Sequence, residues 1–239
     1  MQHPYAAAYK AGWNLAEEFV NMFIGHGGEF FKAGTAEPNI NNAKGVATLN
    51  MLKKLASLSN PDYLTHDSEA IKVEWESGKV ALMTLWASRS GTLLDDEGDA
   101  KITAATKLTG PATVGGGNIP AATLWWDGFT LAKNRSDSDA EATFIALAHA
   151  ASNKKMVADA ADQAVWLVEG FVPGPKSIGV IEAVKMGAKP YPMLPQMGLM
   201  HGALGSEIVE FLQGKESAEQ ALKDVEAAYI SKAKEQGFL

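Results

Sequence analysis

The sequence predicts an α/β fold on two observations. Apolar residues recur with helical spacing over most of the chain, and short apolar or alternating segments typical of strands stand between these helices. The chain has 239 residues and is 46 % hydrophobic, which provides a core for one large or two modest domains. There is no internal repeat and no low-complexity tail, so a solenoid or a disordered tail is not expected.

The first two predicted elements are amphipathic helices. Residues 13–28 predict a helix in which Asn14 is the N-cap, Glu17 completes a capping-box-like pair and Gly25 ends the helix. Residues 41–61 predict a second helix, which Asn41 or Asn42 caps and which ends before a proline. Both helices carry an apolar stripe, so each is expected to lie on the core.

The middle of the chain mixes strands with loops. A short helix in residues 67–78 is followed by a continuously apolar strand in 80–85, a pattern that predicts burial on both faces. Residues 101–108 alternate like a strand, and the glycine- and proline-rich residues 109–122 predict a loop. A further strand is expected at residues 128–132.

The last third of the chain is predicted to be mainly helical. The proline-containing residues 189–197 are expected to be extended. Helices are predicted in residues 136–152, 153–166, 177–187, 198–212 and 217–237.

Composition excludes several classes of partner. The net charge of −7 and the presence of only two arginines, Arg89 and Arg135, argue against nucleic acid and anionic membranes as partners. Without cysteine there is no disulfide, thiolate metal site or cysteine nucleophile. No apolar run is long enough to span a membrane, and the N-terminus lacks the basic start and apolar stretch of a signal peptide.

No motif predicts catalysis, a metal site or a bound cofactor. Residues 114–118 (VGGGN) lack the spacing of a nucleotide-binding loop and indicate a flexible connection. The acidic residues 93–99 lack the spacing of a calcium loop and are interpreted as a solvated turn. The five histidines do not stand at metal-ligand spacing, and there is no nucleophile elbow. We therefore expect no enzymatic activity.

The tryptophans are the most informative residues. Most of them lie where predicted elements begin or end, and strand ends in α/β folds are where clefts form. An indole face beside polar groups suits a sugar, which has an apolar C–H face and hydroxyl groups. The alternative is that four or more of them belong to the core, as Trp75 is expected to. The six residues are Trp13, Trp75, Trp86, Trp125, Trp126 and Trp166.

Residues 122–132 (ATLWWDGFTLA) pose the sharpest question. In a strand, Trp125 and Trp126 point to opposite faces, so both cannot enter one core. The simple interpretation is the start of a strand, with one tryptophan packed and Asp127 in solvent. The alternative is a ligand platform, with one tryptophan facing the ligand and the other packed.

Several segments together resemble the extracellular solute-binding proteins of ABC importers, in the carbohydrate-binding family that includes the maltodextrin-binding proteins. The segments are ESGKVALMTLWASRSG (76–91), DGFTLAKNRSDSDAEATFIALAHAASNKK (127–155), GFVPGPKS (170–177) and MLPQMGLMHGALGSEIVEFLQGKESAEQALKDVEAAY (193–229). Each motif is weak by itself, but their order and spacing follow the family over nearly the whole chain.

The resemblance implies a periplasmic-binding-protein type II-like fold in which this chain holds mostly the second lobe. It implies second-lobe segments in residues 1–100 and 151–239 and a partial first-lobe segment in 101–150. Members of the family are longer, so the chain is expected to lack most of the first lobe. A periplasmic or extracellular location is also implied.

The implied function is capture of a small carbohydrate or polyol by hinge closure, without chemistry, followed by docking on the transmembrane permease of an ABC transporter. We expect a monomer that binds no nucleic acid. His201 stands where maltodextrin binders carry a stacking aromatic ring, which disfavours a long glucan. The predicted ligand-binding residues are Trp13, Trp86, Arg89, Trp125, Trp126, Asp127, Phe171 and His201.

Two other functions stay open at this point. A carbohydrate-active enzyme would use Asp127 or Glu169 as acid or base, although no carboxylate pair marks such a site. A truncated lobe that folds but binds no ligand is the other alternative.

Overall fold

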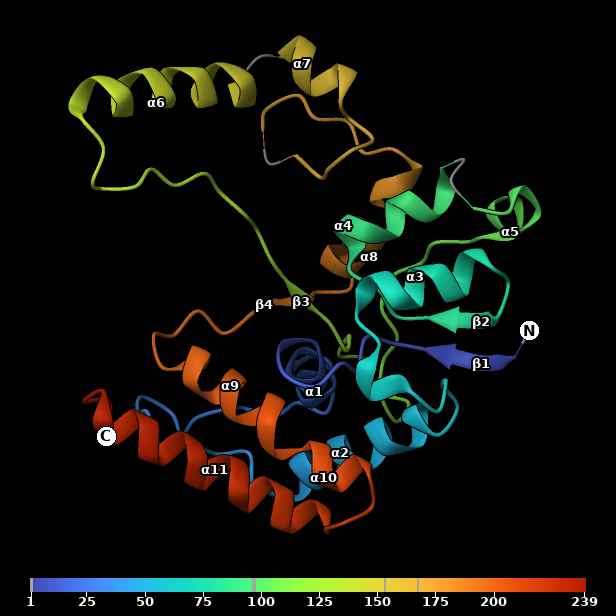
Figure 1. Cartoon of the computed structure of the whole chain (residues 1–239), viewed down its shortest axis with the longest axis vertical. Helices are drawn as coiled ribbons and strands as arrows, with labels where there is room; N and C mark the ends of the chain where they lie inside the picture. The colour runs from blue at the N-terminus through green and yellow to red at the C-terminus, as the bar shows by residue number, and fades with distance from the viewer. Residues whose placement is uncertain (1, 96–97, 153, 167) are drawn as a thin grey trace.

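A computed structural model of the chain describes residues 2–95, 98–152, 154–166 and 168–239 (Figure 1). Asp96 and Glu97, in the predicted acidic turn, lie outside the described residues. The strands are β1 His3–Ala6, β2 Val80–Met83, β3 Thr123–Leu124 and β4 Lys189–Pro190. The α-helices are α1 Trp13–Gly25, α2 Ala43–Ala56, α3 Ser68–Glu76, α4 Ala87–Ser90, α5 Ala100–Ala105, α6 Asp137–Ser152, α7 Lys154–Asp159, α8 Ile178–Lys185, α9 Met197–Glu207, α10 Val209–Leu212 and α11 Ala218–Glu235. Short 3₁₀ helices cover Tyr63–Thr65, Gly91–Leu94 and Pro175–Ser177.

The main core lies between helices from the two ends of the sequence. α1 and α2 pack against α9 and α11, which lie beside them in Figure 1. Fully buried residues such as Phe19 on α1, Leu49 on α2, Leu204 on α9 and Tyr229 on α11 fill the space between them. Burial of this much apolar surface makes the four-helix contact the main source of stability.

Helix caps explain where several helices begin. The Asn42 side chain accepts hydrogen bonds from the backbone N–H groups of Lys44 and Gly45, and this confirms one of the two predicted caps of α2. Asn14 was the wrong cap for α1, because that helix already begins at Trp13. The preceding residue, Gly12, has a φ of 97°, a conformation that favours glycine.

The strands form two small parallel sheets rather than one large one. β1 pairs with β2 in a register that places Tyr5 opposite Leu82. β3 pairs with β4, and Leu124 stands opposite Pro190. The prediction that both faces of the β2 strand are covered is wrong, because the Leu82 side chain is 61 % exposed. A two-stranded sheet leaves that face without a covering layer.

Two predicted strands are absent from the described structure. Residues 100–105 form α5 instead, because the Asp99 side chain caps the helix by accepting from the Lys101 N–H group. Residues 128–132 are irregular and exposed, since no neighbouring strand pairs with them. The alternating residues of both segments are compatible with more than one local structure.

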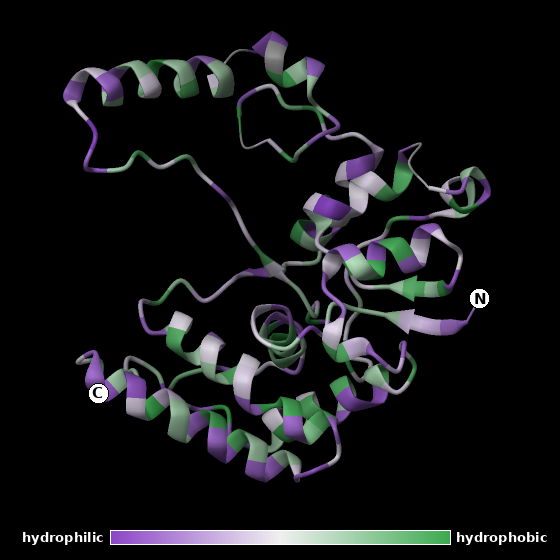
Figure 2. Ribbon diagram, viewed as in Figure 1, coloured by the Kyte–Doolittle hydropathy of each residue, from purple (hydrophilic) through white to green (hydrophobic). Residues whose placement is uncertain are grey.

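An extended arm leaves the helical body after β3. It consists of residues 126–152 and ends in α6, none of whose residues is buried (Figure 1). Hydrophobic residues, drawn in green in Figure 2, occur along α6, and Phe144 and Ile145 are exposed. In contrast, residues 106–124 contact the body, where Val114 and Ala121 lie against Gly25 of α1.

No helix in the described part of the chain has both the length and the hydrophobicity needed to cross a membrane.

Candidate functional site

Five aromatic side chains meet at the junction between the helical body and the β3–β4 pair. The Trp13 ring centroid lies 5.3 Å from that of Trp86, 5.8 Å from that of Trp125 and 4.8 Å from that of His201. Tyr191 completes the group, with its ring centroid 4.1 Å from that of Trp125. We call these five residues the aromatic cluster. Rings at these distances support one another in position.

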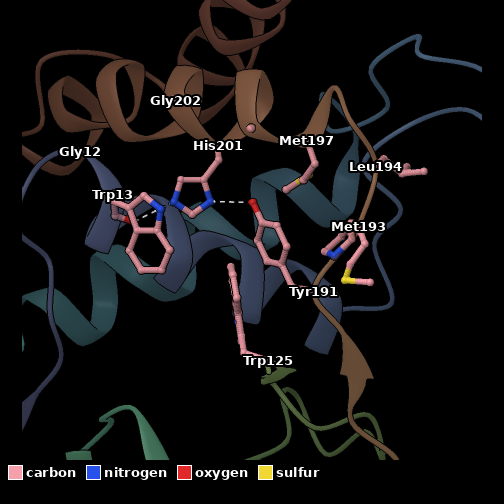
Figure 3. Close-up of a pocket in the computed structure, with 11 residues that line it drawn as sticks. Gly12, Trp13, Trp125, Tyr191, Met193, Leu194, Met197, His201 and Gly202 are labelled. Carbon is pink, nitrogen blue, oxygen red and sulfur yellow. Dashed lines mark hydrogen bonds between the residues drawn. The ribbon is translucent and has the colours of Figure 1, made fainter. Parts of the chain in front are cut away.

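A cavity of about 420 Å³ opens beside the aromatic cluster. Trp13, Trp125, Tyr191 and His201 face it in Figure 3, while Trp86 supports Trp13 from outside the lining. The complete lining is Gly12, Trp13, Trp125, Tyr191, Pro192, Met193, Leu194, Met197, Gly198, His201 and Gly202. The volume lies within the range of about 300–1,000 Å³ that is typical of small-molecule sites.

The parallel pairing of β3 and β4 brings two of these rings together. Leu124 and Pro190 are opposite each other at the ends of the strands, and the Tyr191 N–H group donates to the Leu124 carbonyl oxygen over 3.1 Å. Trp125 directly follows β3, and Tyr191 directly follows β4, so the two rings emerge at the same end of the sheet. Carboxyl ends of parallel strands are common positions for ligand sites.

Trp13 reaches the cavity because α9 comes very close to the start of α1. The Gly12 N–H group donates to the Gly205 carbonyl oxygen over 2.9 Å. A side chain at Gly205 would collide with the Gly12 backbone. The absence of a side chain at Gly205 therefore fixes the position from which Trp13 projects.

His201 connects Trp13 and Tyr191 through hydrogen bonds, drawn as dashed lines in Figure 3. Its Nε2 lies 3.0 Å from the Trp13 carbonyl oxygen, which can only accept, so Nε2 carries the proton. Nδ1 of the neutral ring then accepts from the Tyr191 hydroxyl over 2.9 Å. Burial lowers the His201 pKa and raises the Tyr191 pKa, so both groups are uncharged at neutral pH.

Behind Trp125 lies a buried carboxyl group. Glu17 is 2 % exposed, and its Oε1 is 2.8 Å from the Thr123 hydroxyl oxygen. The Trp125 Nε1–H group donates to that same hydroxyl oxygen over 2.8 Å. Burial raises the pKa of Glu17 to about 7, and hydrogen bonds only partly offset this effect. The predicted capping-box role of Glu17 is wrong, because α1 begins at Trp13 without a side-chain cap and the Glu17 carboxyl group contacts Thr123 instead. Nothing in one amphipathic helix marks a single glutamate as buried.

Of the predicted ligand-binding residues, Trp13, Trp125 and His201 line the cavity, and Trp86 contacts its wall. Tyr191 was missed, although an aromatic residue between two prolines in an extended segment is a usable signal.

The other four predicted residues lie outside the cavity. Trp126 is 50 % exposed, and Asp127 is also exposed where the arm begins. Arg89 forms an ion pair with Glu69 away from the cavity. Phe171 follows the arm and is half-buried. Of the two adjacent tryptophans, Trp125 therefore faces the cavity and Trp126 faces solvent.

No group of three or more His, Asp or Glu side chains in the described part of the chain is arranged to hold a metal ion. The cavity lining contains no carboxylate, and the one histidine in it uses both ring nitrogens in hydrogen bonds. The site presents aromatic and apolar surface, which is suited to binding and orienting a molecule.

Comparison with solved structures establishes the architecture. A maltose-bound MalE3 from T. maritima matches with a TM-score of 0.78 at 16 % identity, over 95 % of this chain and 60 % of that one. An ABC transporter solute-binding protein from Agrobacterium radiobacter K84, in complex with ribitol, matches with a TM-score of 0.75 at 18 % identity. The fold is that of a type II periplasmic binding protein.

The match to the ribitol-bound solute-binding protein covers 95 % of this chain and 58 % of that protein. The MalE domain from Bdellovibrio bacteriovorus, bound to maltotriose, gives a TM-score of 0.74 at 15 % identity, over 98 % of this chain and 60 % of that chain. The chain thus spans about three fifths of the length of these structures. No family model matches the sequence, and no curated protein matches it.

Proposed function

We propose that the chain is a lobe of an ABC importer's substrate-binding component, and that it captures a small carbohydrate or polyol in the aromatic-lined cavity. The observation that carries the proposal is the meeting of Trp13, Trp125 and Tyr191 around one cavity of about 420 Å³. The structural neighbours support it, because they are solute-binding proteins in complex with ribitol, maltose or maltotriose.

The chemistry of the cavity favours an uncharged, partly apolar ligand. Trp125 and Trp13 offer flat faces on which the C–H surface of a sugar stacks. Met193, Leu194 and Met197 extend the apolar wall, and methionine adapts to irregular shapes. A charged ligand would lose its hydration without gaining an ionic partner among the lining residues.

The remaining parts of the proposal concern the complete binding protein. In it, a second lobe closes over the ligand, and the closed form docks on a permease in the periplasm or outside the cell. Trp126, Asp127 and Phe171 would then meet the ligand or the other lobe. The division into residues 1–100, 101–150 and 151–239 stays a prediction, as does a monomeric state.

Isothermal titration calorimetry on this chain tests the proposal. Ribitol, mannitol, tagatose and maltose are titrated separately, with spermidine as a charged comparison. We expect heat of binding for one or more of the uncharged ligands and none for spermidine. Binding of spermidine alone would replace the carbohydrate assignment, and silence towards all five would leave a lobe without ligand.

An enzyme is the second function that the sequence left open, and no observation favours it. Asp127 and Glu169 are both exposed and both lie outside the cavity. Incubation of the chain with maltose, followed by chromatography, should return the sugar unchanged. Release of glucose would restore the enzymatic alternative.

A further inference from the structure

Glu17 is a buried acid behind Trp125, outside the cavity lining. It lies on α1, four residues after Trp13, and is 2 % exposed. Its Oε2 is buried and has no hydrogen-bond partner. A carboxylate buried in this way is costly unless it is neutralised or paired.

The Thr123 hydroxyl is the point where three polar groups meet. Its oxygen is 2.8 Å from Glu17 Oε1, 2.9 Å from Asn21 Oδ1 and 2.8 Å from Trp125 Nε1. The indole can only donate, so the hydroxyl oxygen accepts from it. The hydroxyl has one proton of its own, which serves either Glu17 or Asn21 but not both.

Protonation of Glu17 satisfies all three contacts of the Thr123 hydroxyl at once and removes the charge from the unpartnered Oε2. The carboxylic acid donates to the Thr123 oxygen, which also accepts from Trp125, and Thr123 donates its proton to Asn21. An ionised Glu17 competes with Asn21 for the single hydroxyl proton. Both acceptors are satisfied only if the Asn21 amide flips or the Thr123 hydroxyl rotates. Either change alters the hydrogen bonds of the Thr123 oxygen, which accepts from the Trp125 indole.

We propose that Glu17 is a proton-dependent positioning residue for Trp125, acting through Thr123, so that ligand affinity in the cavity depends on the protonation of Glu17. The inference rests on the proposed function, in that Trp125 is taken to contact the ligand. It assigns to Glu17 an effect on ligand affinity although Glu17 itself does not contact the ligand.

Among the titratable groups around Trp125, few change charge near neutral pH. Burial raises the Glu17 pKa to about 7. Burial, together with the nearby charge of Glu17, raises the pKa of the neighbouring Glu18 to about 8. Tyr191, beyond Trp125, has a raised pKa, and His201, behind it on α9, has a lowered pKa. A transition near neutral pH that Trp125 reports therefore belongs to Glu17 or Glu18, and substitution separates the two.

The test is nuclear magnetic resonance of the indole N–H groups in the full chain labelled with ¹⁵N, from pH 5 to pH 9 without ligand. Each of the six tryptophans contributes one indole N–H signal, and the Trp125 signal is assigned from its loss in Trp125→Phe. We expect the Trp125 signal to shift with a midpoint of about 7, the pKa of Glu17. Trp75 is the internal control, because its indole donates to the Thr106 hydroxyl over 2.9 Å with no carboxyl partner.

Two glutamine variants decide which carboxyl acts. In Glu17→Gln, whose amide donates like the acid but does not titrate, we expect the Trp125 signal to lose its transition. In Glu18→Gln the transition should remain. Thr123→Val, which keeps the side-chain shape and removes the relay, should also abolish it. A Trp125 signal that is constant in the wild type, or that still titrates in Glu17→Gln, would overturn the inference.

Ligand binding is measured separately with ribitol and with maltose at pH 5.5 and pH 8.5. For the ligand that binds, we expect affinity to fall about two- to tenfold at the higher pH, the equivalent of one altered hydrogen bond, and to be constant in Glu17→Gln. Equal affinity at both pH values in the wild type would contradict the proposal that protonation of Glu17 controls ligand affinity. If neither ligand binds at either pH, the proposed function fails while the indole titration still decides whether Glu17 positions Trp125.

Discussion

Two adjacent tryptophans differ in what surrounds them, although the sequence treats them alike. Trp125 packs against Tyr191 and lines the cavity, whereas Trp126 lies outside it; the two side chains are 41 % and 50 % exposed. Alanine substitutions of the two tryptophans therefore form a matched pair, which differs only in whether the ring lines the cavity.

We predict that Trp125→Ala weakens ligand binding by about 1–3 kcal/mol, because it removes a ring face that the bound ligand would cover. Trp126→Ala should leave the affinity of this chain within about 0.5 kcal/mol, as is usual for exposed residues away from a site. Calorimetry with the best ligand of the sugar and polyol series measures both. A larger loss in Trp126→Ala than in Trp125→Ala would show that the ligand lies elsewhere.

The hydrogen bond from Tyr191 to His201 gives a second prediction at this scale. Tyr191→Phe keeps the ring against Trp125 but leaves the buried His201 Nδ1 without a donor. We expect the free energy of unfolding to fall by about 1–3 kcal/mol, the cost of an unsatisfied buried acceptor, with little change in ligand affinity. Urea denaturation followed by circular dichroism measures the first effect. An unchanged unfolding midpoint would mean that water replaces the hydroxyl.

Sequence reasoning identified Trp13, Trp125 and His201 but could not show that they meet. The cluster brings together residues more than 180 positions apart, and only the packing of α9 on α1 places His201 behind Trp13. Tyr191 was missed because its partner, Trp125, becomes a neighbour only through the β3–β4 pairing. Residue types suggest the chemistry of a site, whereas its geometry is set by contacts distant in sequence.

At the scale of the element, α9 contains a matched pair of glycines. A Cβ at Gly205 would collide with the backbone of Gly12, whereas a Cβ at Gly202, one turn earlier, would meet nothing within 4 Å. The two positions share a helix and a backbone conformation, so their difference isolates the contact between α9 and the start of α1.

We predict that Gly205→Ala destabilises the chain by about 1–3 kcal/mol, because α9 must move away from α1. Gly202→Ala should instead stabilise it by about 0.5–1 kcal/mol, the gain of alanine over glycine inside a helix. Thermal unfolding of the two variants beside the wild type measures both signs. A neutral Gly205→Ala would show that the backbone at Gly12 yields easily.

The two carboxyls of α1 make stability depend on pH. The pKa of Glu17 is about 7 and that of Glu18 about 8 in the folded chain, against about 4.3 when unfolded. A raised acid pKa means that the folded state holds the proton more tightly. The contribution of these two protonated groups to the free energy of unfolding is therefore complete below about pH 4.3. It is lost as pH rises from there through the folded pKa values.

We predict that the free energy of unfolding falls by about 2 kcal/mol between pH 5.5 and pH 8.5 on account of Glu17 alone. Urea titrations at several pH values should show the fall in the wild type and a smaller one in Glu17→Gln. Glu29→Gln, at an exposed position, is the control and should follow the wild type. A stability that rises with pH over this range would contradict the assignment.

Among the elements, long amphipathic helices were predicted well and short segments were not. Residues 41–61, with their predicted cap Asn42, correspond to α2, and the amphipathic residues 217–237 correspond to α11. Residues 101–108 failed because their alternation fits one turn and a half of helix once Asp99 caps it. In a short segment a single helix cap can outweigh the hydrophobic periodicity, and tertiary contacts decide which structure forms.

At the scale of the whole molecule, the chain crosses from one half to the other through an exposed arm. α1 and α2 precede the arm, α9 and α11 follow it, and these four helices share the main core. The cavity is divided in the same way, since Trp13 and Trp125 come before the arm and Tyr191 and His201 after it. The core and the cavity thus depend on contacts between the halves rather than on continuity of the arm.

We predict that trypsin cuts first after Lys133 or Arg135, which are exposed in an irregular part of the arm. The two fragments should remain together, because separating them would expose the apolar faces of α1, α2, α9 and α11. Mass spectrometry locates the cut, and gel filtration under native conditions measures whether the fragments co-elute. Cleavage within the helical body before the arm, or separation of the fragments after one cut, would contradict this account of how the halves are held.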